Sequence, residues 1–458
     1  MQEDNMETTV KTVTNGIAFQ TRKLSEEIVH LFNTKEVDED WSFVGYKPSD
    51  TGKWTHSYHR YPAKFIPQLV EKLVDEYISS KRAHINDPFM GCGTTIVTAI
   101  SMGFEASGTD INKIAYLITK VKSTPIQPEY LNKKIGQLMS RLEALDVATL
   151  FNRSKIEPLI PQKHIDRINY WFTEENKNEL GKILRVIYSE EDEIIRNFFL
   201  VAFSNILKSC SLWLQRSTKP TRDLKKKPAK PYHAFQRQLM KMRRGNSAFY
   251  KVVPPKVREN LSQYLKIKIG DARKQPVVDE TVDLVVTSSP YVTSYEYADL
   301  HQLSTIWLDL ANDLTEYKKG FIGTSFKKYE NKRLKSSIAM DIVDKISKKD
   351  KKIAKEIEAF FIDMEEVFDE SYRVLKNGGR CCYVIGDTKL KGVDILNAEV
   401  FAESLQHSGF KIDRLIKREI PSKILPQKRD EKTGRFVPNH EASFEAYPIE
   451  YIVIGLKE

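Results

Sequence analysis

A short apolar segment that ends abruptly in polar and aromatic residues constrains the fold of this chain more than any other feature. Residues 282–291 read VDLVVTSSPY, and Asp283 to Thr287 are predicted to form a buried strand. The Ser-Ser-Pro-Tyr that follows lies beyond the strand end, because Pro290 has no N–H to donate to a sheet ladder. This leaves a hydroxyl, backbone carbonyls and an aromatic ring at the carboxyl edge of a sheet, where α/β proteins bind ligands.

A second segment has the pattern of a strand, a glycine turn and a helix. Ala83–Asp87 is predicted to be a strand and residues 94–102 a helix, with Pro-Phe-Met-Gly-Cys-Gly between them. Glycines let the backbone approach a ligand, and a helix N-terminus favours a negatively charged group. A strand over 104–109 then ends at Asp110, which is placed to accept hydrogen bonds from ribose hydroxyls. The alternatives are a structural tight turn and an aspartate that caps the helix predicted over 112–122.

Further strands and helices complete an α/β pattern. Pro67 can begin a helix, since its missing N–H is not needed at the first helical position. A strand over 265–269 precedes Asp271, which can accept from the exocyclic amine of a bound nucleoside or cap a turn. Helices are also predicted over residues 296–310, 356–375 and 395–408, and strands over 380–386, 410–418 and 449–456.

Between Pro125 and Leu265 the alternation is lost and the chain is predicted to be mostly helical. Residues 216–244 are strongly basic, and the interleaved Tyr232, His233 and Phe235 argue against a plain solvated helix face. A charge run is usually surface or a flexible loop, but phosphate contacts with aromatic stacking are favoured here. The residues predicted to contact a nucleic acid are Arg216, Lys219, Arg222, Lys225, Lys226, Lys227, Lys230, Arg243 and Arg244.

Composition agrees with a polyanionic partner. The 458 residues carry a net charge of +10, from 72 Lys and Arg against 62 Asp and Glu. No apolar run is long enough to span a bilayer, and the polar N-terminus has no signal-peptide core. The four cysteines are in no disulfide or metal-ligand spacing, so we expect the cytoplasm as the location and no metal. They are Cys92, Cys210, Cys381 and Cys382.

Two of these motifs together resemble those of a known family. Residues 87–95, DPFMGCGTT, and residues 287–291, TSSPY, are similar to motifs of S-adenosylmethionine-dependent DNA amino-methyltransferases, which modify cytosine N4 or adenine N6. The resemblance implies a Rossmann-like class I methyltransferase fold: a mostly parallel seven-stranded sheet with a C-terminal antiparallel hairpin, plus a largely helical insertion. S-adenosylmethionine is the implied cofactor and double-stranded DNA the implied partner. A restriction endonuclease of the same system is a further implied partner, though not as a stable complex.

The resemblance also implies roles for single residues. Tyr58–Phe65 is similar to the N-terminal cofactor motif of the family. The implied cofactor-binding residues are Lys64, Phe65, Asp87, Phe89, Gly91, Gly93, Thr94, Asp110 and Asp271. The implied catalytic residues are Ser288, Ser289, Pro290 and Tyr291. A serine at the first of these four positions is typical of the cytosine-N4 enzymes. The Ser288 hydroxyl and a main-chain carbonyl would accept from the amine, and Tyr291 would stack on a base extruded from the duplex.

The chain departs from the family pattern in three ways. Ser289 replaces the usual first proline, Cys92 stands where serine is common, and the long insertion precedes Asp271. Three alternatives to cytosine-N4 methylation are methylation of adenine N6, amino-methylation of RNA, and a degenerate nucleic-acid-binding protein of the same fold. The intact glycine turn, Asp110 and Asp271 argue against the last. Cytosine-C5 methylation needs a nucleophilic cysteine, and none is near the tetrapeptide.

We expect three parts in the chain. Residues 1–55 form a loosely packed N-terminal extension, residues 56–122 and 265–458 form the catalytic domain, and residues 123–264 form the insertion. Target recognition is assigned to this insertion, with contributions from two further basic segments, 312–355 and 421–440.

Overall fold

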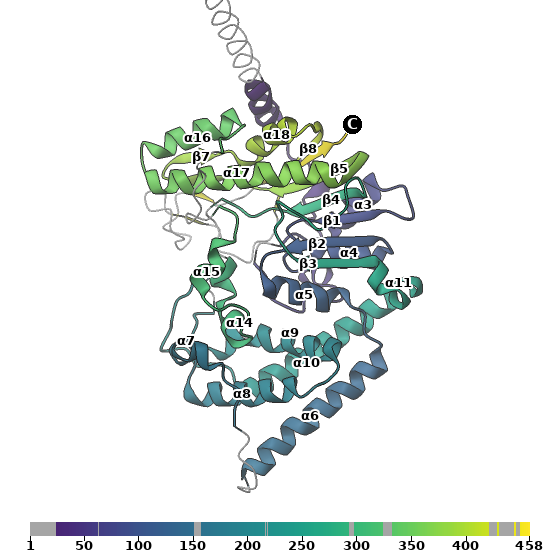
Figure 1. The fold of residues 1–458 in the computed structure, drawn as a ribbon, viewed down its shortest axis with the longest axis vertical. Helices are drawn as coiled ribbons and strands as arrows, with labels where there is room; N and C mark the ends of the chain where they lie inside the picture. Colours follow the sequence, from purple (N-terminus) through teal and green to yellow (C-terminus); the bar gives the residue numbers. More distant parts are fainter. Residues whose placement is uncertain are drawn as a thin grey trace, which may run out of the picture. The chain divides into compact units, whose positions relative to one another are not determined.

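The computed structural model describes residues 24–62, 64–150, 157–215, 217, 219–292, 297–323, 332–420, 428–429, 444–445 and 449–458 (Figure 1). Seven strands form a sheet in the order β3-β2-β1-β4-β5-β11-β8. The strands are β1 (His84–Asp87), β2 (Glu105–Asp110), β3 (Leu265–Ile269), β4 (Val282–Ser288), β5 (Leu375–Ile385), β8 (Lys411–Glu419) and β11 (Ile449–Leu456). β11 runs antiparallel to β5 and β8, so the predicted hairpin is confirmed.

The chain forms two compact units. The first comprises Met1–Gly45, Val277–Ser294 and Phe321–Glu458, and the second comprises Tyr46–Pro276 and Tyr295–Gly320. Strands β1, β2 and β3 therefore belong to the same unit as the helices between residues 125 and 265.

The second unit is built on three parallel strands. β2 pairs in parallel with β1 and with β3, and β1 is buried along its whole length. Helices α3 (Pro67–Tyr77), α4 (Thr94–Met102) and α5 (Lys113–Ser123) occur where the sequence predicts them. Pro67 is the first residue of α3, which confirms the expected helix start. Short elements precede and follow in the same unit: α2 (Pro48–Thr51), α13 (Tyr297–Leu300), α14 (Gln302–Trp307) and α15 (Leu314–Lys319).

The insertion is helical, as predicted. Its elements are α6 (Pro128–Leu150), η2 (Gln162–His164), α7 (Ile165–Trp171), α8 (Glu174–Tyr188), α9 (Glu193–Cys210), α10 (Pro231–Val252), α11 (Pro255–Glu259) and α12 (Leu261–Tyr264). Figure 1 shows α8, α9 and α10 side by side, with α9 next to α5. Ile114 and Ile118 of α5 share one hydrophobic core with Phe198 and Phe203 of α9. The insertion thus stabilises a helix that follows directly on the cofactor-side strand β2.

The first unit contains β4, β5, β11 and β8 with three covering helices. These are α16 (Ser337–Ser347), α17 (Lys351–Val374) and α18 (Asn397–His407), and the rings of Phe368, Tyr383 and Phe401 pack edge to face between sheet and helices. Two small ladders were not predicted: β6 (Thr388–Leu390) with β7 (Val393–Ile395), and β9 (Lys428–Arg429) with β10 (Phe444–Glu445).

Three expectations need correction. The N-terminal extension is not loosely packed where the structure describes it, from residue 24 on, because Phe32 and Trp41 are at most 2% exposed and η1 (Glu39–Trp41) lies on β8. The helix expected over 296–310 is broken at His301, between α13 and α14. The strand expected over 380–386 begins earlier, because β5 starts at Leu375. Its pairing with β4 passes from Leu375 directly to Arg380, so the Asn-Gly-Gly between them does not pair with β4.

Two helical glycines provide a matched test of this packing. A Cβ on Gly245 of α10 would lie 2.4 Å from the Trp54 carbonyl oxygen and 2.7 Å from the Tyr58 ring, whereas one on Gly136 of α6 would meet nothing within 4 Å. We predict that Gly245→Ala destabilises the protein by about 1–3 kcal/mol, because backbone must move. Gly136→Ala should stabilise it by roughly 0.5–1 kcal/mol, because alanine loses less backbone entropy.

Denaturant unfolding of the two variants and the unmodified protein measures both changes. Equal unfolding midpoints for the two variants would contradict the close approach of α10 to residues 54–58.

Candidate active site

The glycine turn after β1 has a backbone conformation that requires glycine. Gly91 and Gly93 both have positive φ, of 46° and 78°, which side-chain-bearing residues rarely adopt. A Cβ on Gly93 would lie 2.8 Å from the Thr119 hydroxyl oxygen, so no larger residue fits there. Asp87 accepts from the Phe89 N–H at 3.0 Å, and Thr94 begins α4 directly after the turn. The turn therefore presents backbone and a helix N-terminus, as the sequence predicts.

Asp110, at the end of β2, is tied to this turn. Its two carboxylate oxygens accept from the Gly91 N–H at 2.9 Å and the Asn112 N–H at 2.8 Å. Each carboxylate oxygen has a second lone pair and can still accept from a ligand hydroxyl. Burial raises the pKa of Asp110 to about 6, although both backbone hydrogen bonds lower it. Asn112, and not Asp110, caps α5 through the Ile114 N–H, so the capping alternative for Asp110 is wrong.

A buried lysine under the turn was not predicted. The Lys122 ammonium is 0% exposed and donates to the Cys92 carbonyl at 2.6 Å, and Thr119 donates to the Gly91 carbonyl at 2.8 Å. Burial lowers the pKa of Lys122 to about 8, and nearby Lys64 lowers it further while Cys92 opposes the shift. Both side chains project from α5 and occupy carbonyls of the turn. Nothing in the local sequence separates Lys122 from an ordinary surface lysine.

The segment similar to the N-terminal cofactor motif lies close to the turn. A Cβ on Gly91 would lie 3.3 Å from the Tyr61 ring, so this tyrosine covers the turn on one side. Phe65 is buried, and the exposed Lys64 ammonium donates to the His56 carbonyl at 2.9 Å. The structure thus brings the glycine turn, Asp110 and this segment together within one unit.

Asp271 lies in a turn after β3. Its carboxylate accepts from the Arg273 backbone N–H at 3.0 Å and from its guanidinium at 2.9 Å. These bonds fit the turn-capping alternative, and a role in adenine binding stays a prediction.

The tetrapeptide follows β4 in the first unit, as predicted. Ser288 ends the strand opposite Val384 of β5 and is half-buried. The Ser289 side chain is 1% exposed, and its hydroxyl oxygen has no hydrogen-bond partner in the described structure. A buried hydroxyl left unpaired costs roughly 1–3 kcal/mol. The Tyr291 hydroxyl donates to a Glu450 carboxylate oxygen at 2.9 Å.

The basic stretch divides into exposed and internal side chains. Lys226 is internal: its ammonium donates to the carbonyls of Lys208 and Trp213, and burial lowers its pKa to about 8. Phe235 is 0% exposed in the core, so the expected stacking role is wrong for it. The exposed members of the predicted set are Lys219, Arg222, Lys225, Lys227, Lys230, Arg243 and Arg244. Arg216 lies outside the described residues.

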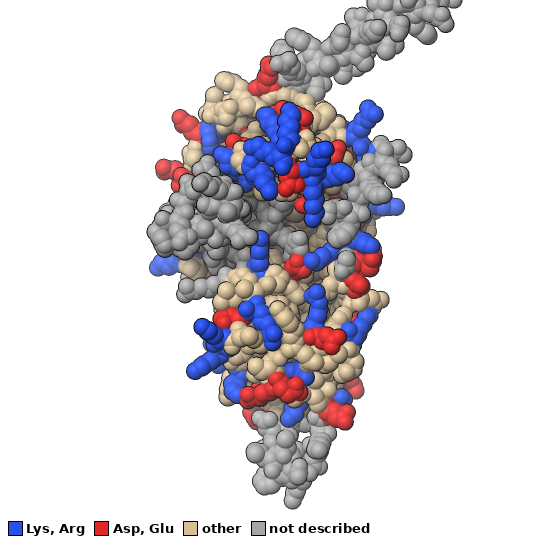
Figure 2. Space-filling model, turned by 90° about the vertical axis from the view of Figure 1, so that its left-hand side faces the viewer, with Lys and Arg blue, Asp and Glu red and all other residues tan. Residues whose placement is uncertain are grey.

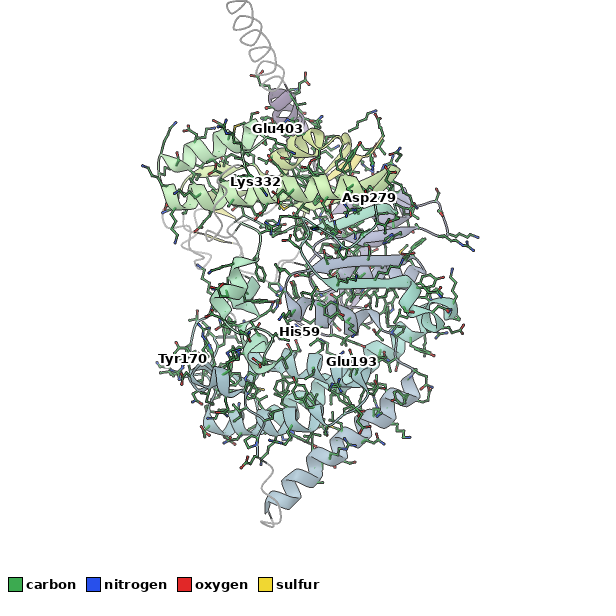
Figure 3. The ribbon with its side chains drawn as sticks, in the orientation of Figure 1. His59, Tyr170, Glu193, Asp279, Lys332 and Glu403 are labelled. Carbon is green, nitrogen blue, oxygen red and sulfur yellow. The ribbon has the colours of Figure 1, made fainter. Side chains whose placement is uncertain are left out.

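Two of the exposed residues make contacts of their own. Lys230 pairs with Glu175, and the Arg222 guanidinium lies 4.4 Å from the ring centre of Tyr170, which Figure 3 labels at the edge of the insertion. Figure 2 shows Lys and Arg side chains interspersed with carboxylates.

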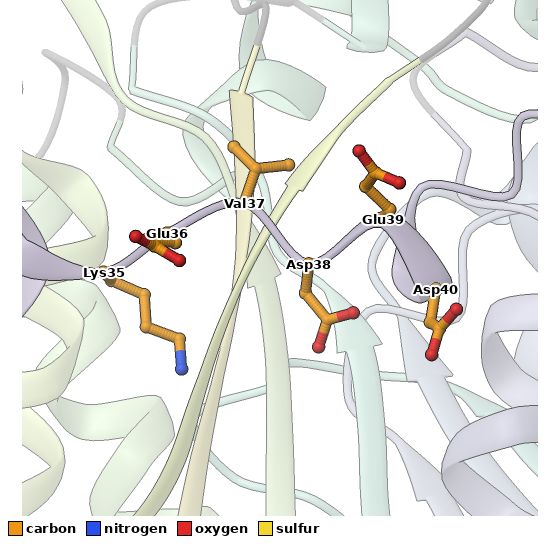
Figure 4. Close-up of a pocket in the computed structure, with 6 residues that line it drawn as sticks. All are labelled: Lys35, Glu36, Val37, Asp38, Glu39 and Asp40. Atoms are coloured by element: carbon orange, nitrogen blue, oxygen red, sulfur yellow. The ribbon is translucent and has the colours of Figure 1, made fainter.

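A hollow of about 430 Å³ lies elsewhere, along the N-terminal segment (Figure 4). It is lined by residues 35–40, of which four are acidic, and it contains none of the predicted site residues. In the described part of the chain, no helix is long and apolar enough to cross a membrane.

Comparison with known proteins places these features in a family. Residues 7–120 and 282–448 match the family model of the N6/N4 DNA methylases. The chain belongs to this family of DNA methyltransferases. Membership confirms DNA as the substrate class and S-adenosylmethionine as the methyl donor. The mostly parallel seven-stranded sheet with its antiparallel β11 confirms the expected fold.

Curated relatives agree over most of the chain. The type II methyltransferase M.MvaI of Kocuria varians is 28% identical over 88% of this chain and 93% of its own. M.BsoBI of Geobacillus stearothermophilus is 21% identical, with 87% of each chain covered. Among solved structures, a SAM-dependent methyltransferase from Methanosarcina mazei is 9% identical, with 87% of this chain and 98% of that chain covered and a TM-score of 0.29.

The pKa of Asp110 predicts how cofactor binding depends on pH. Its folded-state pKa of about 6 means that the carboxyl gains a proton as the pH falls below 6. If the ionised form accepts from the ribose, the dissociation constant of S-adenosylmethionine rises by about tenfold per pH unit below that value. Calorimetric titration between pH 5 and 8 measures it. Asp110→Asn is the control: it should bind weakly without this pH dependence, whereas a flat profile for the unmodified protein would contradict the assignment.

Proposed function

We propose that the chain is a site-specific DNA methyltransferase that modifies the exocyclic amine of an extruded base, and that this amine is N4 of cytosine. The observation that carries the proposal is Ser288, a half-buried serine at the carboxyl end of β4 that begins the Ser-Ser-Pro-Tyr segment. Site specificity is supported by the relatives, M.MvaI and M.BsoBI, which are named type II methyltransferases.

An exocyclic amine is a poor nucleophile, because its lone pair is delocalised into the ring. Two acceptors for its hydrogens draw the nitrogen towards sp³ geometry, and we assign this task to the Ser288 hydroxyl oxygen and the Ser289 carbonyl. When bound, S-adenosylmethionine supplies an electrophilic methyl group on sulfur. The work of the chain is then positioning and electrostatic stabilisation. Tyr291 stacks on the extruded base, and Pro290 limits the conformations of the loop.

The cofactor contacts in the proposal follow the geometry of the second unit. The glycine turn is assigned to the cofactor because it joins the end of β1 to the N-terminus of α4, where a negatively charged group is favoured. Asp110 accepts from the ribose hydroxyls. The other proposed cofactor-binding residues are Lys64, Phe65, Asp87, Phe89, Gly91, Thr94 and Asp271.

Target recognition is proposed for the insertion, residues 123–264, next to the catalytic parts at 56–122 and 265–458. Its exposed Lys and Arg side chains are suited to phosphates, which position a protein on DNA without reading sequence. A restriction endonuclease of the same specificity is the proposed functional partner, acting separately on the same DNA.

Nucleoside analysis tests the proposed product. The protein is incubated with unmodified duplex DNA and methyl-labelled S-adenosylmethionine, and the digested nucleosides are separated. We expect label in N4-methylcytosine. Label only in N6-methyladenine would overturn the cytosine assignment while retaining the family activity, and label only in RNA would overturn the DNA assignment.

The same assay measures the role of Ser288. Ser288→Ala removes one of the two acceptors for the amine hydrogens. We expect a loss of about 10²–10³-fold in turnover, the magnitude found for removal of one oxyanion-hole donor, with unchanged S-adenosylmethionine affinity. An active Ser288→Ala protein would remove this hydroxyl from the mechanism.

The salt dependence of DNA binding tests the proposed phosphate contacts of the basic stretch, residues 216–244. Lys225 and Lys227 are exposed, so the double change to glutamine should weaken DNA binding and lower the slope of log K against log salt by roughly 2. The matched control is Lys226→Gln, because the Lys226 ammonium donates to the carbonyls of Lys208 and Trp213. It should lower stability and leave the slope unchanged. An unchanged slope in the double variant would place the phosphate contacts elsewhere.

A further inference from the structure

The Tyr291 ring is located by two strands of its own unit. Its hydroxyl donates to one carboxylate oxygen of Glu450, near the start of β11, at 2.9 Å. Its ring lies against Gly386, just after β5, where an added Cβ would be 3.2 Å from a ring carbon. One contact fixes the far end of the side chain and the other limits how the ring can tilt.

Glu450 is itself held by a second partner. Its other carboxylate oxygen accepts from Arg418 of β8 twice, from Nε at 3.1 Å and from Nη2 at 2.9 Å. The side chains of Arg418 and Glu450 are only 5% and 12% exposed. Two guanidinium N–H groups that donate to one oxygen, shielded from water, give the pair a defined geometry, in contrast to a solvated surface pair.

The N-terminal segment completes this arrangement. The remaining Arg418 nitrogen, Nη1, donates to the Trp41 carbonyl at 2.9 Å. The segment is fixed to the same strand by the Asp38 N–H, which donates to the Lys417 carbonyl at 2.7 Å, and by the Ser42 hydroxyl, which accepts from the Glu419 N–H at 3.1 Å. The Trp41 carbonyl is therefore a fixed acceptor for Arg418.

We propose that Glu450 and Arg418 are positioning residues that act through the Tyr291 hydroxyl and hold its ring for stacking on the extruded base. The N-terminal segment, through the Trp41 carbonyl, is then part of the device. The proposal rests on the stacking role of Tyr291 given above and adds two residues that no motif of the family resemblance includes.

A purely structural ion pair would have different consequences. Glu450 would then stabilise the unit whether or not Tyr291 carries a hydroxyl, and its removal would have the same effect in both backgrounds. A positioning role requires that the effect of Glu450 on methyl transfer depends on that hydroxyl.

A double-mutant cycle separates the two. Methyl-transfer rates are measured on unmodified plasmid DNA, under single-turnover conditions, for the unmodified protein, Tyr291→Phe, Glu450→Gln and the double variant. An amide offers one oxygen and one N–H₂ group, so Glu450→Gln cannot accept from both Tyr291 and Arg418. We expect about a tenfold slower transfer for either single variant, with little further loss in the double variant and unchanged S-adenosylmethionine affinity.

The control is Glu458→Gln, which removes an exposed ion pair with Lys411 of β8 and should leave the rate unchanged. Equal slowing by Glu450→Gln in both backgrounds would overturn the proposal. So would an unchanged rate in Tyr291→Phe, which leaves the ion pair intact and removes one hydroxyl. Tyr291→Ala tests the stacking itself: full activity there would refute the proposed role of the ring, whereas an inactive Tyr291→Ala with a fully active Tyr291→Phe would refute only the positioning.

Discussion

A hydrogen bond from a backbone N–H to an aspartate carboxylate holds the chain at the carboxyl end of four strands. Asp87 and Asp110 are the last residues of β1 and β2, and they accept from the N–H groups of Phe89 and Asn112. Asp271 and Asp387 lie two residues beyond β3 and β5, and they accept from the N–H groups of Arg273 and Ala398. Strand β4 instead runs into Ser288. The residue at the end of β4 is thus a neutral hydroxyl and not a carboxylate.

The glycine turn after β1 is fixed by hydrogen bonds to its backbone. Lys122 and Thr119 of α5 donate to its Cys92 and Gly91 carbonyls, and the Gly91 N–H donates to Asp110. Because α5 packs on the insertion through Ile114 and Ile118, the insertion also contributes to the rigidity of the turn. A segment assigned to target recognition thereby has a second role in the fold, and the two roles are physically linked through one helix.

Local patterns were sufficient to predict the strands of the seven-stranded sheet, the glycine turn and the position of Ser288, because each depends on residues adjacent in sequence. The place of Asp110 at a strand end was predicted in the same way. The sequence left two readings of Asp271 open, because its bond to Arg273 depends on a turn conformation. Lys122 and the pair of Arg418 with Glu450 were missed altogether. The roles of these residues depend on tertiary contacts. The neighbouring residues in the sequence do not distinguish a buried lysine or arginine from a solvated one.

The contact between Arg418 and the Trp41 carbonyl joins residues 377 positions apart in the chain. Phe32 packs on Tyr451 in the same way, with ring centres 5.2 Å apart. The N-terminal residues are synthesised before β8 and β11. They therefore cannot make these contacts until both strands have been synthesised. The contacts of Tyr291 with Glu450 and of Arg418 with Trp41 therefore form late in the biogenesis of the protein, after β1, β2 and β3 have emerged.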